Sequence, residues 1–169
     1  MPRLAISPGE SLYYEYTAPA EKDATFVFVN ALTGSTGMWS GEICEALRSA
    51  GHGTLCLNFR GQAETEVGDS TKLTPDLVVS DLRTLLAQLD PPAPILVGLS
   101  IGGLFAAQAY LAGARAIGLV LINTLRKPSQ RLEWINQAMV RLARLGGGRL
   151  VMTANMPVIA SPPLLARMW

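Results

Sequence analysis

The sequence has few cysteines, one histidine, few charged residues and no long apolar run. Its two cysteines, Cys44 and Cys56, lie in apolar patterns and form no C-x-x-C pair, which predicts buried thiols in a reducing compartment. No stretch of about 18 apolar residues is present, so no membrane-spanning helix is expected. The first ten residues lack the apolar core of a signal peptide. Together these features predict a cytoplasmic protein.

The net charge of +1 gives no indication of a nucleic acid or an anionic membrane as a partner. The charges are distributed unevenly: residues 1–114 carry 6 basic and 12 acidic side chains, and residues 115–169 carry 8 basic ones and one acid, Glu133. One explanation is a binding face. The explanation that we favour is that the acidic complement of the second part lies elsewhere in a longer protein.

Hydrophobic residues make up 49% of the 169 residues, which suits one globular domain with its own core. Four short apolar runs predict buried strands, at residues 25–30, 54–58, 95–99 and 117–122. Helical spacing and capping signals predict helices between them, at residues 38–50, 74–90 and 100–112. This alternation indicates an α/β fold with a mostly parallel sheet and flanking helices. Residues 4–7 and 12–16 are expected to form an edge hairpin through Pro8-Gly9.

The pattern changes from Pro128 onward. A helix is predicted at residues 131–145, a break at Gly146-Gly147-Gly148 and the start of another helix at residues 161–169. No apolar strand returns in this part of the sequence. We therefore divide the chain into an α/β core, residues 1–127, and a helical segment, residues 128–169.

The stretch Gly98-Leu99-Ser100-Ile101-Gly102 fits the G-x-S-x-G pattern of a nucleophile elbow. A serine hydroxyl is a poor nucleophile and needs a base, an exposed position and an oxyanion site. A strained turn between a strand and a helix provides the exposure, and the glycines on both sides relieve the crowding. The pattern stands here between a predicted buried strand and a predicted helix, as the mechanism requires. Ser100 is therefore the predicted nucleophile, with the backbone N–H of Ile101 as an oxyanion donor.

A different interpretation is that Ser100 caps a helix in a glycine-rich turn, as in a dinucleotide-binding fold. That fold places G-x-G-x-x-G after its first strand. In this sequence the glycines follow a later strand, and a serine stands at the strained position. The nucleophile is therefore the favoured interpretation.

On these motifs the chain resembles the N-terminal part of an α/β-hydrolase of the esterase, lactonase and carbon–carbon-bond hydrolase type. In that family a strand ends in His-Gly and the oxyanion loop follows. The matching residues here are 29–34, with Asn30-Ala31 in place of His-Gly, as in enol-lactonase-like members, and with Met38-Trp39 opening the next helix. The resemblance implies that the backbone N–H of Leu32 is a second oxyanion donor.

The family's D-x-R-G-x-G-x-S stretch corresponds to residues 58–65, where Arg60-Gly61 matches and positions 58, 63 and 65 differ. We interpret Arg60 as a partner in a structural ion pair between loops rather than as a catalytic residue. The resemblance covers residues 10–125, and residues 129–169 resemble the beginning of the family's helical cap. Six apolar residues of this cap line an apolar pocket or form ordinary packing with the core: Trp134, Ile135, Met139, Val140, Met152 and Met156.

In the family the serine is followed along the chain by an acid and then by a histidine. His52 precedes Ser100 and is expected at the opposite end of the strands, about 20 Å away, whereas a general base must come within about 3 Å. Glu133 is the sole carboxylate after Ser100 and lies in the predicted cap. Asn123 ends the fourth strand, where some members have the acid, but an amide carries no charge. The favoured explanation is a longer protein of roughly 250 residues whose remainder holds both groups.

The sequence thus predicts a serine hydrolase domain that acts on a carboxylic ester, thioester or lactone-type carbonyl of a small apolar acyl substrate. No metal and no cofactor are implied, and neither a nucleic acid nor a membrane is expected as a partner. The chain alone is expected to be inactive because it lacks the catalytic acid and base. Two alternatives stay open: an acyltransferase or perhydrolase on the same fold, and a non-catalytic pseudo-hydrolase that serves as an interaction domain.

Overall fold

The computed structural model describes residues 2–124, 127 and 129–168. These residues form two compact units, which divide between residues 125 and 126. The boundary expected between residues 127 and 128 involves Pro128, which lies outside the described residues. Each unit is described by itself below.

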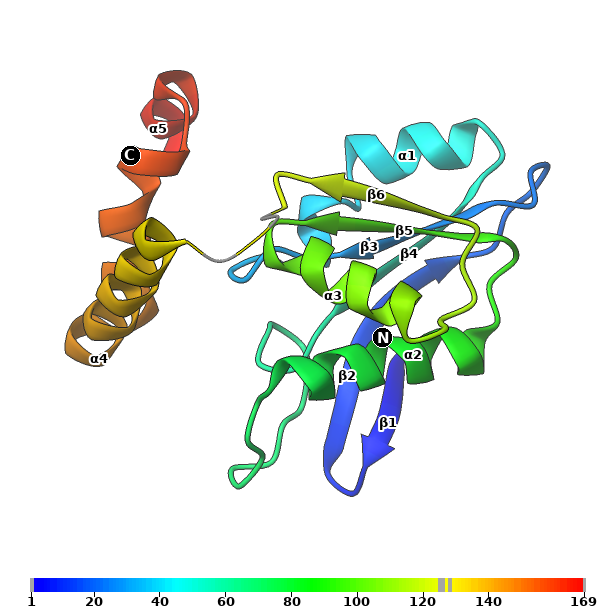
Figure 1. Ribbon diagram of the computed structural model, residues 1–169. Helices are drawn as coiled ribbons and strands as arrows, with labels where there is room; N and C mark the ends of the chain where they lie inside the picture. The colour runs from blue at the N-terminus through cyan, green and yellow to red at the C-terminus, as the bar shows by residue number, and fades with distance from the viewer. Residues whose placement is uncertain (1, 125–126, 128, 169) are drawn as a thin grey trace. The chain divides into compact units, whose positions relative to one another are not determined.

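The first unit is built on a six-stranded sheet with the strand order β1-β2-β4-β3-β5-β6 (Figure 1). Its strands are β1 (Arg3–Ser7), β2 (Glu10–Thr17), β3 (Thr25–Val29), β4 (Gly53–Asn58), β5 (Pro94–Leu99) and β6 (Gly118–Ile122). The strands β4, β3, β5 and β6 run parallel, while β1 and β2 form an antiparallel hairpin that pairs with β4. The predicted α/β fold with a mostly parallel sheet and an edge hairpin is confirmed.

Three helices cover the sheet, with α1 (Glu42–Ser49) on one face and α2 (Pro75–Leu89) and α3 (Ile101–Leu111) on the other (Figure 1). The helix α2 begins as its capping signal predicts. The Thr74 side chain accepts a hydrogen bond from the Leu77 N–H at 3.3 Å, and Pro75 takes the first helical position. The capped start of α2 matters for the site because it fixes where the preceding loop ends.

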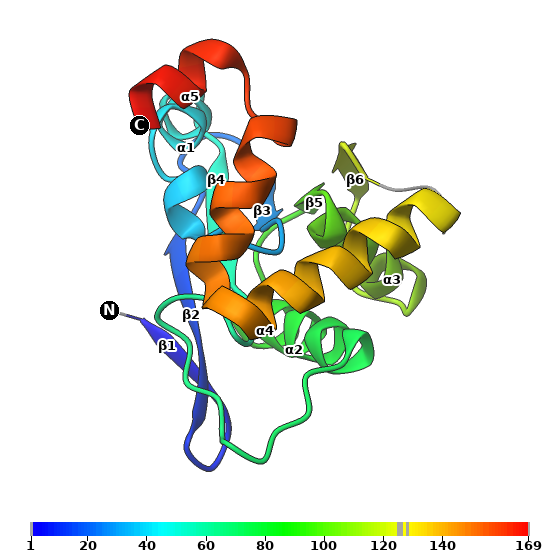
Figure 2. The same ribbon diagram turned by 90° about the vertical axis from the view of Figure 1, so that its left-hand side faces the viewer.

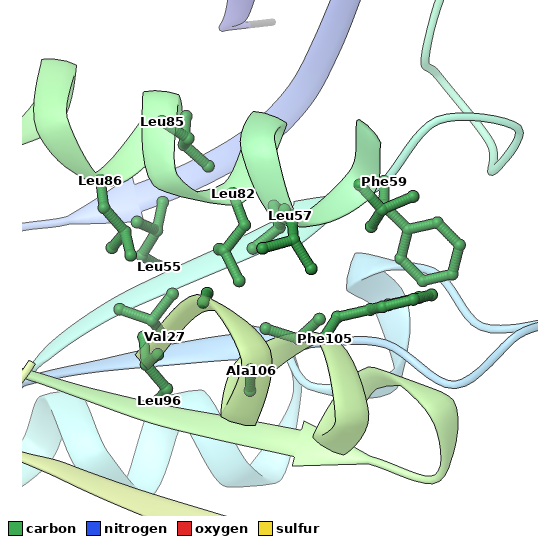
Figure 3. Close-up of a cluster of buried hydrophobic side chains, with 14 residues drawn as sticks. Val27, Leu55, Leu57, Phe59, Leu82, Leu85, Leu86, Leu96, Phe105 and Ala106 are labelled. Carbon is green, nitrogen blue, oxygen red and sulfur yellow. The ribbon is translucent and has the colours of Figure 1, made fainter. Parts of the chain in front are cut away.

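Side chains alternate along the strands and so divide the core between the two faces of the sheet. The larger cluster lies against α2 and α3 and includes Val27, Leu55, Leu57, Leu82, Leu85, Leu96, Phe105 and Ala106 (Figure 3). The smaller cluster lies against α1 and consists of Phe28, Trp39, Cys44, Cys56 and Val97. The two faces together hold the parallel strands rigidly from both sides, which fixes the positions of their C-terminal ends.

The two cysteines are free and buried, as predicted, and their sulfur atoms lie 3.5 Å apart. Burial raises the pKa of the Cys56 thiol. Because the thiolate is the reactive form, the raised pKa makes Cys56 unreactive. The two buried side chains join α1 to β4.

The helix predicted from Met38 onward is interrupted in the structure. Residues Thr36–Met38 form a short 3-10 turn, and α1 begins separately at Glu42. Trp39 turns inward, where its ring stacks on Phe28 with 4.8 Å between the ring centroids. Because the indole is buried, the chain turns inward at Trp39 and the helix is not continuous. Gly41 is then the N-terminal cap residue of α1.

The strand β6 is more exposed than the prediction of a buried strand implies. Val120, Leu121 and Ile122 keep 41%, 48% and 40% of their surface exposed. β6 pairs with β5 on one side, and no strand among the described residues pairs with its other side. An apolar run therefore identified the strand correctly but not its position at the sheet edge.

The second unit consists of α4 (Gln130–Ile159) and α5 (Pro162–Met168). Gly146 and Gly147 leave helical geometry, with Gly147 at a φ of +63°, and Figure 2 shows α4 changing direction there. The predicted break is confirmed at Gly146 and Gly147, whereas Gly148 already has helical geometry. The helical stretch that resumes at Gly148 and ends at Ile159 was not predicted. The helix expected at residues 161–169 corresponds to α5, and Trp169 lies outside the described residues.

Across the part of the chain that the structure describes, no helix combines the length and the apolar character needed to cross a membrane.

Candidate active site

Ser100 stands between the end of β5 and the start of α3 in a backbone conformation that side chains rarely adopt. Its φ is +56° and its ψ is −121°. Such a conformation costs about 1–3 kcal/mol and persists only where the surroundings enforce it. Two backbone hydrogen bonds do so: the Ser100 N–H donates to the Ile122 carbonyl at 2.9 Å, and the Gly103 N–H donates to the Ser100 carbonyl at 3.1 Å. A strained turn between a strand and a helix is typical of a nucleophile elbow. Residues 98–102 are called the elbow below.

The glycines around Ser100 are required by the close approach of backbone segments. A Cβ atom at Gly98 would lie 2.4 Å from the Gly103 Cα. A Cβ atom at Gly102 would lie 2.3 Å from the carbonyl oxygens of both Val29 and Asn30. Neither contact can be relieved by a side-chain rotation, because the neighbouring atoms belong to the main chain. The start of α3 is therefore pressed directly against the end of β3.

The loop that follows β3, residues 30–34, is called the β3 loop below. It closes in a turn in which the Gly34 N–H donates to the Ala31 carbonyl at 3.0 Å. The Leu32 side chain at its tip is exposed. Because Gly102 touches the carbonyl of Asn30, the β3 loop leaves the sheet directly beside the elbow.

Asn30 anchors the β3 loop from below and is fully buried. Its side-chain oxygen accepts a hydrogen bond from the Trp39 indole N–H at 2.7 Å. Its side-chain nitrogen lies within hydrogen-bond distance of three acceptors, the Leu57 carbonyl at 2.8 Å, the Asn58 amide oxygen at 2.9 Å and the Gln62 amide oxygen at 3.0 Å. Asn30, which stands where the family pattern has histidine, is thus the centre of a buried polar network.

Gln62 clamps the β3 loop from the side. Its side-chain nitrogen donates to the carbonyls of Ala31 at 2.7 Å and Leu32 at 3.3 Å. Its side-chain oxygen accepts from the Phe59 N–H at 3.2 Å, in addition to Asn30. This role of Gln62 was not predicted, because the position is a free one in the D-x-R-G-x-G-x-S pattern. No local signal marks this role, because the partners Asn30 and Ala31 lie 32 and 31 positions earlier in the sequence.

Arg60 forms the structural ion pair that the sequence predicts. Its guanidinium contacts the Asp81 carboxylate at 2.5 Å and 3.1 Å through two nitrogens, and a third nitrogen contacts Glu10. Hydrogen bonding to Asp81 raises the pKa of Arg60. The Ser7 and Thr71 hydroxyls, the Gly68 N–H and Arg60 together lower the pKa of Glu10 to about 2. All charges of the cluster are therefore engaged in holding the loop after β4 in place.

His52 is far from Ser100, as predicted. Thr25 pairs with Gly53 on one side and with Pro94 on the other, so His52 stands at the strand beginnings. Six strand residues at about 3.3 Å each separate that edge from Ser100, a distance of about 20 Å. The His52 ring packs edge-on against Phe26 at 5.3 Å between centroids, and its Nδ1 has no hydrogen-bond partner among the described residues.

The two remaining candidates, Glu133 and Asn123, supply no acid within the first unit. Glu133 is exposed on α4 in the second unit, where its carboxylate accepts a hydrogen bond from Gln137 at 3.1 Å. Asn123 follows β6 with a φ of +47° and is exposed. Within the first unit, the described residues thus assemble an elbow and its neighbouring loop without an acid and a base beside Ser100.

A cavity of about 280 Å³ lies beside the elbow and is called the side cavity below. Leu32 and Ile101, whose backbone N–H groups are the expected oxyanion donors, both line it. Its other lining residues come from the loop after β4, from the start of α2 and from the first turns of α3. The structure thus brings the two expected donor residues to one hollow at the C-terminal ends of β3 and β5.

Solved structures with a similar fold include a carboxylesterase structure from the thaumarchaeon Nitrososphaera gargenis, with 23% identity, a TM-score of 0.80 and 95% of this chain and 58% of that chain covered. An α/β-hydrolase enzyme from a Medee basin deep-sea metagenome library has 22% identity and a TM-score of 0.82, with 99% of this chain and 60% of that chain covered. The enol-lactonase of Burkholderia xenovorans has 24% identity and a TM-score of 0.78, with 98% of this chain and 62% of that chain covered. At these identities the likeness concerns the fold.

The chain spans 58% to 62% of the length of these three structures. No protein with a curated description matches the sequence. The family model of the α/β-hydrolase fold matches residues 24–154, which contain β3 to β6, the elbow and most of α4. With this match over most of the chain, and with the strained serine turn between β5 and α3, the chain belongs to the α/β-hydrolase fold family.

Proposed function

We propose that the whole protein is a serine hydrolase that cleaves a carboxylic ester, thioester or lactone-type carbonyl with Ser100 as its nucleophile. The observation that carries this proposal is the strained backbone of Ser100 between β5 and α3. A backbone at φ +56° is costly for a serine that only caps a helix, and its side chain makes no capping hydrogen bond in α3. Strain of this kind is typical of a residue that must present its hydroxyl to a substrate.

In the proposed reaction the Ser100 Oγ attacks the carbonyl carbon and forms a tetrahedral intermediate. The backbone N–H groups of Leu32 and Ile101 stabilise its negatively charged oxygen. A general base accepts the serine proton and returns it to the leaving alcohol, thiol or hydroxyl, and water then releases the acid from the acyl-enzyme. The whole protein must therefore place a histidine and a carboxylate beside Ser100.

The test of the nucleophile is labelling of the whole protein with a fluorophosphonate probe, which reacts with activated serines. We expect one label on Ser100, complete loss of the label in Ser100→Ala and full labelling in Ser80→Ala, a matched change of an exposed serine on α2. Labelling that persists in Ser100→Ala would overturn the assignment.

The 169-residue chain by itself is expected to hydrolyse p-nitrophenyl acetate at the background rate. Its single histidine is about 20 Å from Ser100, so the imidazole cannot accept the proton of the hydroxyl. Turnover that exceeds background and disappears in Ser100→Ala would contradict this expectation.

A second candidate is a non-catalytic domain that binds a partner through a hydrolase fold, since the described residues of the first unit place no histidine beside Ser100. The two candidates differ in what the whole protein does with the probe. A whole protein that is folded but takes up no fluorophosphonate supports the non-catalytic domain.

A further inference from the structure

We propose that Gln62 is a positioning residue for the proposed reaction: its side-chain amide holds the peptide unit between Ala31 and Leu32 so that the Leu32 N–H stays turned toward the substrate oxygen. This inference rests on the proposed function, because it assumes that the Leu32 N–H is an oxyanion donor. It assigns a role in the reaction to a side chain that acts only through the backbone of another residue.

The β3 loop and the loop that carries Gln62 leave the sheet side by side. The strands β3 and β4 are parallel neighbours, and Val29 at the end of β3 pairs with Leu57 near the end of β4. A turn follows β4, in which the Gln62 N–H donates to the Phe59 carbonyl at 3.0 Å. The Gln62 side chain thereby reaches the β3 loop, although its contact there lies 31 positions earlier in the sequence.

The orientation of the Gln62 side-chain amide is determined by its backbone partners. The Phe59 N–H can only donate, and it donates to the Gln62 Oε1 at 3.2 Å. The carbonyls of Ala31 and Leu32 can only accept, and they lie 2.7 Å and 3.3 Å from the Nε2 atom. Turning the amide over would break all three contacts, so the nitrogen is the atom that faces the β3 loop.

One of these carbonyls belongs to the same peptide unit as the proposed oxyanion donor. The Ala31 C=O and the Leu32 N–H are the two ends of one planar trans peptide, so they point in opposite directions. The Ala31 oxygen accepts two hydrogen bonds, from the Gln62 Nε2 at 2.7 Å and from the Gly34 N–H at 3.0 Å. Because this oxygen is fixed, the direction of the Leu32 N–H is fixed as well, and rotation of the peptide would break both hydrogen bonds.

The Leu32 N–H itself has no acceptor among the described residues of the first unit, and the same holds for the Ile101 N–H at the first position of α3. Both residues line the side cavity. A hydrogen bond to the carbonyl end of a peptide strengthens the bond that its N–H end makes. Gln62 therefore both orients the Leu32 N–H and strengthens it as a donor.

The variant Gln62→Glu separates the two ends of the side-chain amide. The introduced carboxylate has the shape of the amide and still accepts from the Phe59 N–H, but it has no N–H to donate to the Ala31 carbonyl. A second variant, Gln62→Met, has a similar length and makes neither contact. Urea unfolding of both variants shows whether they fold and how much stability they lose.

The first readout is the steady-state hydrolysis of p-nitrophenyl acetate by the whole protein. In both Gln62 variants we expect kcat to fall at least about tenfold while KM changes less than about twofold, because the lost interaction is made only in the transition state. Gln108→Glu, the same substitution at an exposed glutamine on α3, should leave kcat unchanged. A loss of stability with kcat retained would mean that Gln62 only holds the loop after β4, and this overturns the proposal.

The second readout is NMR of the isotope-labelled 169-residue chain, which needs no catalysis. The unchanged chain should show a scalar coupling across the hydrogen bond between the Gln62 Nε2 and the Ala31 carbonyl carbon. In Gln62→Glu the Leu32 amide resonance should move, while the Ser100 amide resonance keeps its position because the elbow is held by main-chain contacts. A missing coupling or an unmoved Leu32 resonance overturns the proposal. Failure of the proposed function is seen separately, as the absence of fluorophosphonate labelling at Ser100 in the unchanged whole protein.

Discussion

The elbow and the β3 loop touch one another at the C-terminal ends of β5 and β3, yet they are held by different forces. The elbow is fixed by main-chain packing, with glycines where any Cβ would collide with backbone atoms. The β3 loop is fixed by side-chain amides, chiefly Asn30 and Gln62, that satisfy buried carbonyls and N–H groups. A substitution in the elbow should therefore lower the stability of the whole fold. A substitution in the β3 loop should mainly increase the local mobility of that loop.

The largest effect is expected for Gly102→Ala. The new methyl group would lie 2.3 Å from two carbonyl oxygens of the main chain, so α3 and β3 must separate. We expect a loss of at least about 3 kcal/mol in the free energy of unfolding measured with urea. Gly118→Ala on β6, where the added methyl group meets open space, is the control and should change stability by about 0.5 kcal/mol or less. Equal stability of the two variants would contradict the close packing of the elbow.

Asn30→Ala should have the next largest effect, about 2 to 3 kcal/mol, because it leaves the buried Trp39 indole N–H without its acceptor and deprives the Leu57 carbonyl of a donor. Hydrogen exchange should become faster at the Leu32 and Gly34 amides and stay slow at the Ser100 amide. Gln108→Ala, the removal of an exposed amide on α3, is the control. Equal acceleration at Ser100 would show that the β3 loop and the elbow move as one body.

Ser100→Gly should stabilise the protein by about 1 kcal/mol, since glycine adopts a positive φ without the strain that serine bears. The matched change Ser80→Gly within α2 should instead cost about 0.5 kcal/mol. Urea unfolding of both variants checks the pair. A loss of stability in Ser100→Gly would mean that the elbow is not strained.

The smallest expected effect is a dependence of the free energy of unfolding on pH. The pKa of Glu10 is lowered to about 2 in the folded protein from an ordinary value of 4.5, so the unfolded state binds the proton first. The stability that Glu10 contributes is complete above pH 4.5 and is lost as the pH falls toward 2. Urea unfolding between pH 7 and pH 3 should show a decline that is smaller in Glu10→Gln. Hydrogen exchange at Leu32 should rise in this range before exchange at Ser100, because the Glu10–Arg60 contact anchors the loop that carries Gln62.

The same contrast explains what the sequence could predict. The elbow was predictable because only glycine avoids a collision with the main chain two positions before and two positions after Ser100. The spacing of Gly98 and Gly102 in the sequence shows this requirement directly. The clamp of Asn30 and Gln62 was not, because a hydrogen bond between side chains 32 positions apart leaves no local pattern. The apolar run of β6 likewise predicted a strand, but burial depends on what lies beside it, and that is a property of the assembled sheet. The inward turn of Trp39, which divides the first helix, was decided by the same assembly.

The main-chain contacts at Gly98 and Gly102 also determine which positions of the protein tolerate substitution. A collision with a side chain can be cured by a second substitution that makes room, but a collision with a carbonyl oxygen cannot. Changes at the two glycines therefore have no compensating partner anywhere in the chain. Libraries aimed at a new specificity are therefore better directed at the side chains that line the side cavity and should leave the elbow untouched.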